Sequence, residues 1–306
     1  MFKKITQKLN NAPKNAITPH LISDCIKPRR ADMHKGDCGR LFVCAGSIGL
    51  TGAAILATKT ALRCGSGLVT LGCCDSLNTI FEICLTEAMT MPMPSENGKL
   101  SYSAIDDIVA NANKSNAILA GPGLSQSDDL HRLINDLIPA LEVSAVMDAD
   151  ALNLISQNPN ILKKSHQPVI ITPHIGEFSR LTGKPCDEIL SDTQSFASEF
   201  SVRYGCVTVL KSHRTVVAMP SGEVYVNMLG NPGMATGGCG DVLSGAIASF
   251  LAQGNTARDA ALCGVFLHSL AADMAVLEFG EYSLIASDII KYIPYAIQET
   301  AKNIRE

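Results

Sequence analysis

The sequence contains no tryptophan, and aromatic residues make up only 5% of its 306 positions. A hydrophobic core must therefore be built from aliphatic residues, alanine, methionine and cysteine. These residues are plentiful, because 46% of the chain is hydrophobic and only 18% is charged. This composition excludes a disordered chain and predicts a protein with a sizeable buried core.

Basic residues are not in excess either. The chain has 25 lysines and arginines against 29 aspartates and glutamates, which gives a net charge of −4. A mild negative charge argues against nucleic acid or an anionic membrane as the main partner. No apolar segment follows residues 1–4, so we expect no signal peptide. The apolar stretch at 242–252 is shorter than the roughly 18 residues of a membrane span.

No two of the eleven cysteines are spaced as C-x-x-C. A zinc site or a disulfide framework would show such a regular spacing. We therefore expect reduced thiols that fill the core of a cytoplasmic protein.

Short aliphatic and β-branched runs recur along the chain and are continuous rather than alternating, which indicates strands buried on both faces. We expect strands at 41–45, 68–71, 117–120, 144–147, 168–171, 207–210, 216–219 and 224–226. Helical patterns occupy 53–64, 128–138, 187–202, 241–252 and 256–277, whereas residues 91–98 are interpreted as a loop. The alternation predicts one α/β domain, with a mostly parallel sheet covered by helices on both faces.

Two glycine-rich turns follow predicted strands. The segment RLFVCAGSIGLTG at 40–52 leads from a strand into a helix, so its backbone N–H groups can face an anion. Its spacing matches neither the dinucleotide-binding fingerprint nor a P-loop, and a tight turn that needs glycine for steric reasons explains it equally well. The AGPG turn at 120–123 is explained more simply as a rigid turn.

Polar residues gather after three other strands, where ligands bind in open α/β sheets. Asp148 and Asp150 follow the strand at 144–147, although Asp150 is equally an ordinary helix N-cap. His174 and Glu177 follow the strand at 168–171 and form a site candidate. The basic turn at 211–215 suits a phosphate or ribose, or else is a solvated hairpin tip.

The segment ATGGCGD at 235–241 carries the strongest signal. Three glycines in four positions run into the apolar helix at 242–252, and such a helix N-terminus offers backbone N–H donors and a favourable dipole to an anion. Asp241, in the first turn, is placed to accept a proton from a substrate hydroxyl while a transferred phosphate sits on these N–H groups. A simple N-cap would not need three glycines.

Taken in order, these segments resemble the nucleotide-dependent NAD(P)H-hydrate dehydratases, which have the ribokinase-like fold. The resemblance covers residues 18–295 and rests on HKGDCGRLFVCAGSIGLTGAA, AGPGLS, MDADALN, TPHIGEF, LKSHRT and NPGMATGGCGD. It implies a domain at 18–306, preceded by a polar tail at 1–17 that we expect to be frayed. It also implies the stand-alone form of the enzyme, which works with a separate NAD(P)H-hydrate epimerase. A homo-oligomer is expected because oligomers are common in such folds.

The implied reaction restores NADH or NADPH from its hydrate in the S form, using ADP, which is released as AMP and phosphate, or ATP. Mg²⁺ is expected to accompany the nucleotide, and no metal ligands are singled out. By motif, Asp241 is the catalytic base. The hydrate is contacted by Ala53 or Ala54, Gly123, His174 and Asp241. The nucleotide is held by Lys211, Ser212, His213, Arg214, Thr215, Gly238, Cys239 and Gly240.

Two positions depart from the usual family pattern. Cys239 stands where serine or threonine is usual, and Ser212 stands where glycine often follows the lysine. Neither change removes a backbone N–H group. Two alternatives are a small-molecule alcohol kinase of the same fold and a non-catalytic nucleotide-sensing module. A dinucleotide oxidoreductase is disfavoured because the chain lacks its glycine fingerprint.

Overall fold

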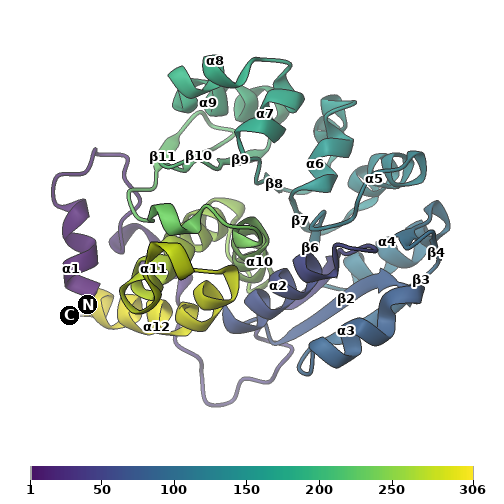
Figure 1. The fold of residues 1–306 in the computed structure, drawn as a ribbon, viewed down its shortest axis with the longest axis horizontal. Helices are drawn as coiled ribbons and strands as arrows, with labels where there is room; N and C mark the ends of the chain where they lie inside the picture. The colour runs from purple at the N-terminus through teal and green to yellow at the C-terminus, as the bar shows by residue number, and fades with distance from the viewer. Residues whose placement is uncertain (1, 306) are drawn as a thin grey trace.

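The computed structural model describes residues 2–305 and shows a nine-stranded sheet between two layers of helices (Figure 1). The strand order is β11-β10-β9-β8-β7-β6-β1-β2-β3. All neighbours from β9 to β3 are parallel, whereas β9, β10 and β11 form an antiparallel meander. The strands are β1 (Arg40–Cys44), β2 (Leu68–Cys74), β3 (Met89–Met93), β6 (Ala117–Ala120), β7 (Ser144–Met147), β8 (Val169–Ile171), β9 (Val207–Leu210), β10 (Val216–Ala218) and β11 (Val224–Val226).

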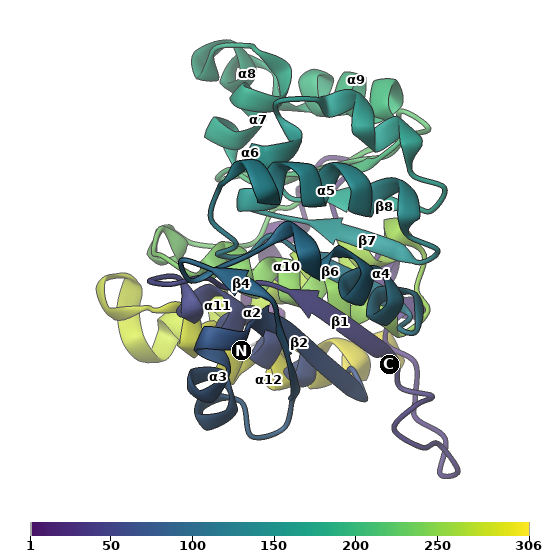
Figure 2. The same ribbon diagram turned by 90° about the vertical axis from the view of Figure 1, so that its right-hand side faces the viewer.

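Helices cover both faces of the sheet (Figure 2). One face carries α2 (Thr51–Arg63), α10 (Cys239–Ala252) and α11 (Ala257–Ser283), with α12 (Ala286–Arg305) packed on them. The other face carries α4 (Ile105–Asn113), α5 (Asp128–Ala140), α6 (Asp150–Ile155), α7 (Ile175–Thr182), α8 (Cys186–Ser191) and α9 (Thr193–Tyr204). Helix α3 (Asn78–Cys84) lies beside β3, and β4 (Ser95–Glu96) and β5 (Lys99–Leu100) form a separate hairpin.

The predicted fold class is confirmed, and all eight predicted strands are present. Residues 91–98 are not a simple loop, because Met89–Met93 forms the edge strand β3. This strand contains Pro92, which an edge tolerates because one side of the strand needs no backbone donor. The single helix expected at 187–202 is two helices, since Asp192 ends α8 and caps α9 by accepting a hydrogen bond from the Ser195 N–H at 3.1 Å.

Helix α10 is buried along almost its whole length between α2, α11 and the sheet. Two glycines allow this close packing. A Cβ on Gly245 would lie 2.4 Å from the Ala57 carbonyl oxygen of α2, and a Cβ on Gly264 of α11 would lie 2.5 Å from Ile247 of α10. Close backbone approach is therefore built into both contacts.

Helix α11, with 27 residues, is longer than the apolar stretch at 242–252. By length and composition alone it is long enough to cross a membrane, but 89% of its most apolar window is buried inside the fold. That burial is typical of a central core helix. The cysteines in the described part of the chain are all free, and most of them are buried, as predicted.

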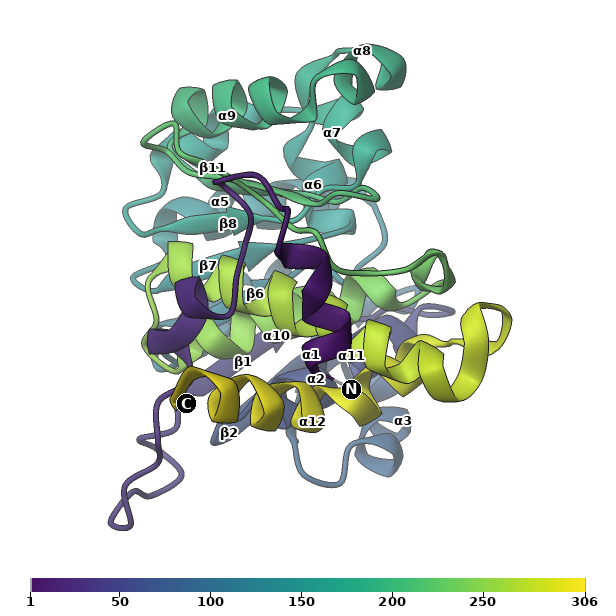
Figure 3. The ribbon, with the colours of Figure 1, turned by 90° about the vertical axis from the view of Figure 1, so that its left-hand side faces the viewer.

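The N-terminal segment packs on the body of the molecule instead of fraying. Helix α1 (Phe2–Thr6) lies against α11 and α12 (Figure 3), and Phe2 and Ile5 are buried there. Ala16 extends the sheet as a parallel bridge to Val226, and the Ile17 N–H donates to the Val226 carbonyl at 2.9 Å. These few apolar contacts could not be predicted, because most of residues 1–17 are polar. The division of the chain at residues 17 and 18 stays a prediction.

Candidate active site

Five adjacent parallel strands, β9, β8, β7, β6 and β1, end at the same edge of the sheet. Each is followed by one of the segments singled out from the sequence: 211–215, 172–177, 148–150, 121–123 and 46–52. The chain runs outward from β1 through β2 to β3 and then returns to β6, so the strand order reverses between β1 and β6. Ligands of open α/β sheets bind in the crevice at such a point.

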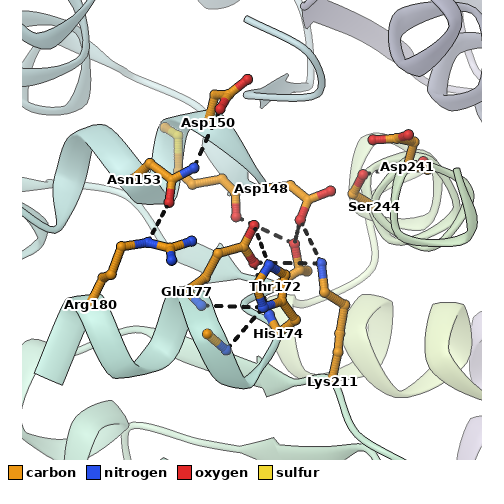
Figure 4. Close-up of polar contacts among 12 residues, drawn as sticks. Asp148, Asp150, Asn153, Thr172, His174, Glu177, Arg180, Lys211, Asp241 and Ser244 are labelled. Carbon is orange, nitrogen blue, oxygen red and sulfur yellow. Dashed lines mark hydrogen bonds and ion pairs between the residues drawn. The ribbon is translucent and has the colours of Figure 1, made fainter. Parts of the chain in front are cut away.

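A cluster of charged side chains lies at this edge (Figure 4). Lys211 Nζ is 3.0 Å from Asp148 Oδ1 and 3.9 Å from Glu177 Oε2. Thr172 donates its hydroxyl to Asp148 Oδ1 at 2.7 Å. Asp241 extends from the first turn of α10 toward Asp148. The cluster holds three carboxylates and one lysine, and Asp148 and Glu177 are buried.

The surroundings shift the protonation equilibria of the cluster. Burial raises the pKa of Asp241 to about 7, and the negative charge of Asp148 adds to that rise, while Lys211 opposes it. Burial also raises the pKa of Glu177. Burial by itself would lower the pKa of Lys211, but Asp148 and Glu177 outweigh it, so the net shift is upward. A carboxylate that titrates near neutrality in a polar cleft is suited to general base catalysis.

The turn after β7 is strained. Ala149 has φ 49° and ψ −116°, which is an uncommon conformation for a residue with a Cβ. This turn directs Asp148 toward Lys211 and Asp150 toward the Ser125 N–H, which it accepts at 2.7 Å. Gly121 is required beside it, because a Cβ there would lie 1.8 Å from the Asp148 carbonyl oxygen.

His174 is the N-cap of α7. Its Nδ1 accepts hydrogen bonds from the N–H groups of Gly176 and Glu177, and the Glu177 carboxylate accepts from the His174 N–H at 2.8 Å, which completes a capping box. Burial lowers the pKa of His174, with Lys211 adding to the effect, so the ring is neutral and Nδ1 is free to accept. His174 therefore has a structural role that the sequence left open.

The N-terminus of α10 is open toward the same edge. Gly238 is the N-cap with φ 93°, and a Cβ there would lie 2.5 Å from Leu56 Cδ1. The first intrahelical bond runs from the Val242 N–H to the Gly238 carbonyl, so the preceding N–H groups of the first turn are donors without an intrahelical partner. Lys211 Nζ would lie 3.3 Å from a Cβ on Gly240, which places this cation beside the open helix end.

A cavity of about 920 Å³ adjoins this helix end, a volume within the usual range for a small-molecule site. Its lining consists of Lys8, His174, residues 211–215, 227–232 and 234–236, Cys239, Gly240, Leu243, Val265, His268 and Ser269. The basic turn and the glycine-rich turn predicted to hold a nucleotide thus line one cavity, together with His174. Gly238, the remaining residue of the predicted set, caps the helix whose next two residues line it.

Part of the cavity wall was not predicted from the sequence. No role was assigned to 227–230 or to His268, whose burial lowers the pKa to about 4 and keeps the ring neutral. The only signal for the loop was the Asn-Pro-Gly sequence at 231–233, which forms a short 3₁₀ turn capped by the Asn231 side chain. Lys8 comes from a segment that was expected to be frayed.

Ala53, Ala54 and Gly123 do not line this cavity. Ala53 and Ala54 lie in the first turn of α2, and Gly123 lies in the turn after β6, where a Cβ on Gly123 would be 3.1 Å from Ala53 Cβ. Ala53 is partly exposed, whereas Ala54 is fully buried and cannot present its side chain to a ligand. The Ser47 hydroxyl donates to the Gly123 carbonyl at 2.8 Å and joins the two turns.

The described residues contain no group of three or more side chains arranged to hold a metal ion. Asp148 Oδ2, however, is buried, has no hydrogen-bond partner in the part of the chain that the structure describes, and points toward Asp241. Magnesium is usually held by one or two carboxylates together with substrate phosphates and waters. The residues present therefore fit a Mg²⁺ ion that is bound jointly with a nucleotide.

Comparison with known proteins gives consistent results. The sequence model of the NAD(P)H-hydrate dehydratase family matches residues 41–295. The bifunctional NAD(P)H-hydrate repair enzyme Nnr of Moorella thermoacetica is 39% identical over 279 residues, which cover 90% of this chain and 53% of that protein. The enzyme of the same name from Escherichia coli is 37% identical over 88% of this chain and 49% of its own length. The chain thus spans about half the length of these curated relatives.

Solved structures extend the comparison. The ADP/ATP-dependent NAD(P)H-hydrate dehydratase of Bacillus subtilis, co-crystallised with ATP and Mg²⁺, matches with a TM-score of 0.81 and 30% identity over 95% of this chain and 99% of that one. A hydroxyethylthiazole kinase from Pyrococcus horikoshii shares only the fold, at 11% identity and a TM-score of 0.57 over 90% of this chain and 92% of that one.

The sheet order, the strand-end site and the open end of α10 define a ribokinase-like α/β protein. The family match narrows this class. The chain belongs to the NAD(P)H-hydrate dehydratase family.

Proposed function

We propose that this chain catalyses the nucleotide-dependent dehydration of the S form of NADH hydrate or NADPH hydrate, which restores the working cofactor. The carrying observation is the position of Asp241, which belongs to the carboxylate–lysine cluster and to the first turn of α10. It directly follows Gly240, which lines the cavity of about 920 Å³. The names of the bacterial relatives support the substrate, and the Bacillus subtilis enzyme supports ADP or ATP as the co-substrate.

The chemistry follows from the poor leaving ability of hydroxide. Asp241 takes the proton of the hydrate hydroxyl as its oxygen attacks the terminal phosphoryl group of the nucleotide, and the shortened nucleotide leaves. The bond between the carbon and the phosphorylated oxygen then breaks and phosphate leaves, while the adjacent carbon loses a proton, which restores the double bond. With ADP the products are AMP, phosphate and NAD(P)H. Mg²⁺, when bound, offsets the charge of the phosphates.

The side chains of this chain then have distinct roles. Backbone N–H groups at the start of α10 and the Lys211 cation stabilise the transferred phosphoryl group. Residues 211–215, Gly238, Cys239 and Gly240 hold the nucleotide. Ala53, Gly123, His174 and Asp241 contact the hydrate. Asp148, whose Oδ2 is buried without a hydrogen-bond partner among the described residues, is the carboxylate that fits Mg²⁺ beside the phosphates.

Three predictions about the cellular setting accompany this function. We propose that the chain acts in the cytoplasm, forms a homo-oligomer and receives its substrate from a separate NAD(P)H-hydrate epimerase. The bifunctional names of the relatives support a second repair activity that acts alongside this one. Size-exclusion chromatography with light scattering tests the oligomer.

The deciding experiment offers hydrated NADH or NADPH with ADP or ATP and Mg²⁺, and follows the return of the near-ultraviolet absorbance of the reduced cofactor. Recovery that depends on nucleotide supports the proposal. No recovery with either nucleotide overturns it. Accumulation of a stable phosphorylated alcohol would instead identify a kinase of the same fold.

A further inference from the structure

One wall of the cavity is a loop that is tied to α11 by the buried carboxylate of Asp273 and by the hydroxyl of Ser269. Asp273 of α11 accepts a hydrogen bond from the Gly230 N–H at 3.1 Å through Oδ2 and from the Asn231 side-chain amide at 2.9 Å through Oδ1. Its side chain is only 4% exposed. Ser269, one turn earlier on α11, accepts from the Asn227 side-chain amide at 2.8 Å. The loop at 227–231 is therefore fastened along one face of α11.

The charge of Asp273 is balanced from the N-terminal segment. Lys8 Nζ lies 3.2 Å from Asp273 Oδ2, the oxygen that also accepts from Gly230. Lys8 belongs to the short 3₁₀ turn Gln7–Leu9, directly after α1, and this turn lies outside the residues that the family model matches. Lys8 also lines the cavity. A buried carboxylate that loses its paired cation is destabilised, and its remaining hydrogen bonds are strained as it turns toward water.

We propose that Asp273 is a positioning residue for the bound nucleotide and that Lys8 sets nucleotide affinity by acting through it. This inference rests on the proposed function, which assigns the cavity to ADP or ATP. With Lys8 paired, Asp273 holds Gly230 and Asn231 in the conformation that forms the cavity wall. Without Lys8, the carboxylate is drawn toward water and the loop loses its anchor. The N-terminal segment thereby becomes part of the nucleotide site.

The first test measures ADP and ATP affinity by titration calorimetry. We expect Lys8→Met to raise Kd about 1.5- to fivefold, the range set by a partly exposed ion pair, and Lys8→Arg to restore it. In turnover assays KM for the nucleotide rises with kcat unchanged. Lys14→Met, which alters another exposed lysine of the same segment, is the matched control and leaves both values unchanged.

A double-mutant cycle separates an indirect role from direct contact. If Lys8 acts through Asp273, Lys8→Met adds little in an Asp273→Asn background, because the buried charge is already gone. An equal loss in both backgrounds would show that Lys8 touches the nucleotide itself and would overturn the inference. Equal Kd values for Lys8→Met, Lys14→Met and the unaltered chain would also overturn it.

A third measurement needs no ligand and remains decisive if Asp273→Asn fails to fold. Hydrogen exchange at the Gly230 amide reports the bond to Asp273, so Lys8→Met must speed its exchange while the amides of α10 stay protected. Unchanged exchange at Gly230 would refute the proposed coupling. If the unaltered chain bound neither ADP nor ATP while Gly230 responded as expected, the proposed function would fail and the coupling would stand.

Discussion

Lys211 Nζ and Asp148 Oδ1 lie 3.0 Å apart, so a largely buried ion pair joins the ends of β9 and β7 across the intervening strand β8. The same lysine lies 3.9 Å from Glu177 and lines the cavity that we propose for the nucleotide. A phosphate that enters the cavity therefore competes with two buried carboxylates for one cation. The proposed nucleotide binding would therefore be coupled to the charge state of the two carboxylates through this side chain.

Replacing Lys211 by methionine should destabilise the protein by about 3–5 kcal/mol, since breaking one side of a buried pair leaves an uncompensated charge. Adding Asp148→Asn to the same chain should recover much of this loss. Urea unfolding of the single and double variants measures both effects. A double variant no more stable than Lys211→Met alone would mean that the ion pair does not account for the loss.

Asp241→Asn should reduce turnover by about 10²–10⁴-fold, the usual contribution of a positioned base. Asparagine keeps the size of the side chain but cannot take the proton at neutral pH. Nucleotide affinity should be unchanged, and this measurement is the control for folding and binding. A variant that binds nucleotide and keeps near-normal turnover would move the search for the base to Asp148, Asp150 or Glu177.

The pH dependence of turnover should show an ascending limb near pH 7. The pKa of Asp241 is raised to about 7, first by burial and then by Asp148, while Lys211 works against the rise. The base is therefore protonated below this value, and the rate climbs as pH increases through it. The limb should be absent from the residual activity of Asp241→Asn. A limb that persists unchanged in that variant would assign it to another group.

The same shift predicts an effect on stability. A carboxyl group whose pKa is higher in the folded than in the unfolded state stabilises the fold most when protonated, and that contribution is lost as pH rises toward about 7. The melting temperature of Asp241→Asn should therefore exceed that of the unaltered chain, by a margin that widens from about pH 5 to about pH 8. A margin independent of pH would contradict the shift.

His174→Ala should weaken hydrate binding more than nucleotide binding, and it should also lower the melting temperature. The second effect follows from the two α7 N–H groups that lose their acceptor, a cost of about 0.5–2 kcal/mol. His174→Asn keeps a capping acceptor and should restore stability without restoring hydrate affinity. Equal losses for both ligands would leave His174 with a structural role alone.

Cys239→Ser should leave turnover within a few fold. Burial raises the pKa of the Cys239 thiol to about 11, so the sulfur is a neutral thiol and not a nucleophile. The residue contributes its backbone N–H to the open end of α10, and serine contributes the same group. A collapse of turnover with unchanged nucleotide affinity would show that the thiol itself takes part.

The strands and the glycine-rich turns could be predicted from the sequence because each depends on local pattern: continuous β-branched runs, and glycine before an apolar helix. Strand β3 could not, because an edge strand with Pro92 has no such pattern. The pairing of Lys211 with Asp148 could not be predicted either, because the two residues lie 63 positions apart in sequence and follow different strands. The ion pair between Lys8 and Asp273 could not be predicted for the same reason, since these residues lie 265 positions apart. Long-range charge pairs leave no periodic trace in a single sequence.

The glycine contacts of α10 bear on which mutations the protein tolerates. Gly245 lies one helical turn after Asp241 and meets the α2 backbone so closely that an added methyl group must push the helix aside. Such a shift would be passed along a rigid helix to Asp241 and to the N–H groups at its start. Inactivating substitutions should therefore be found well down the buried length of α10, at positions that never meet a ligand.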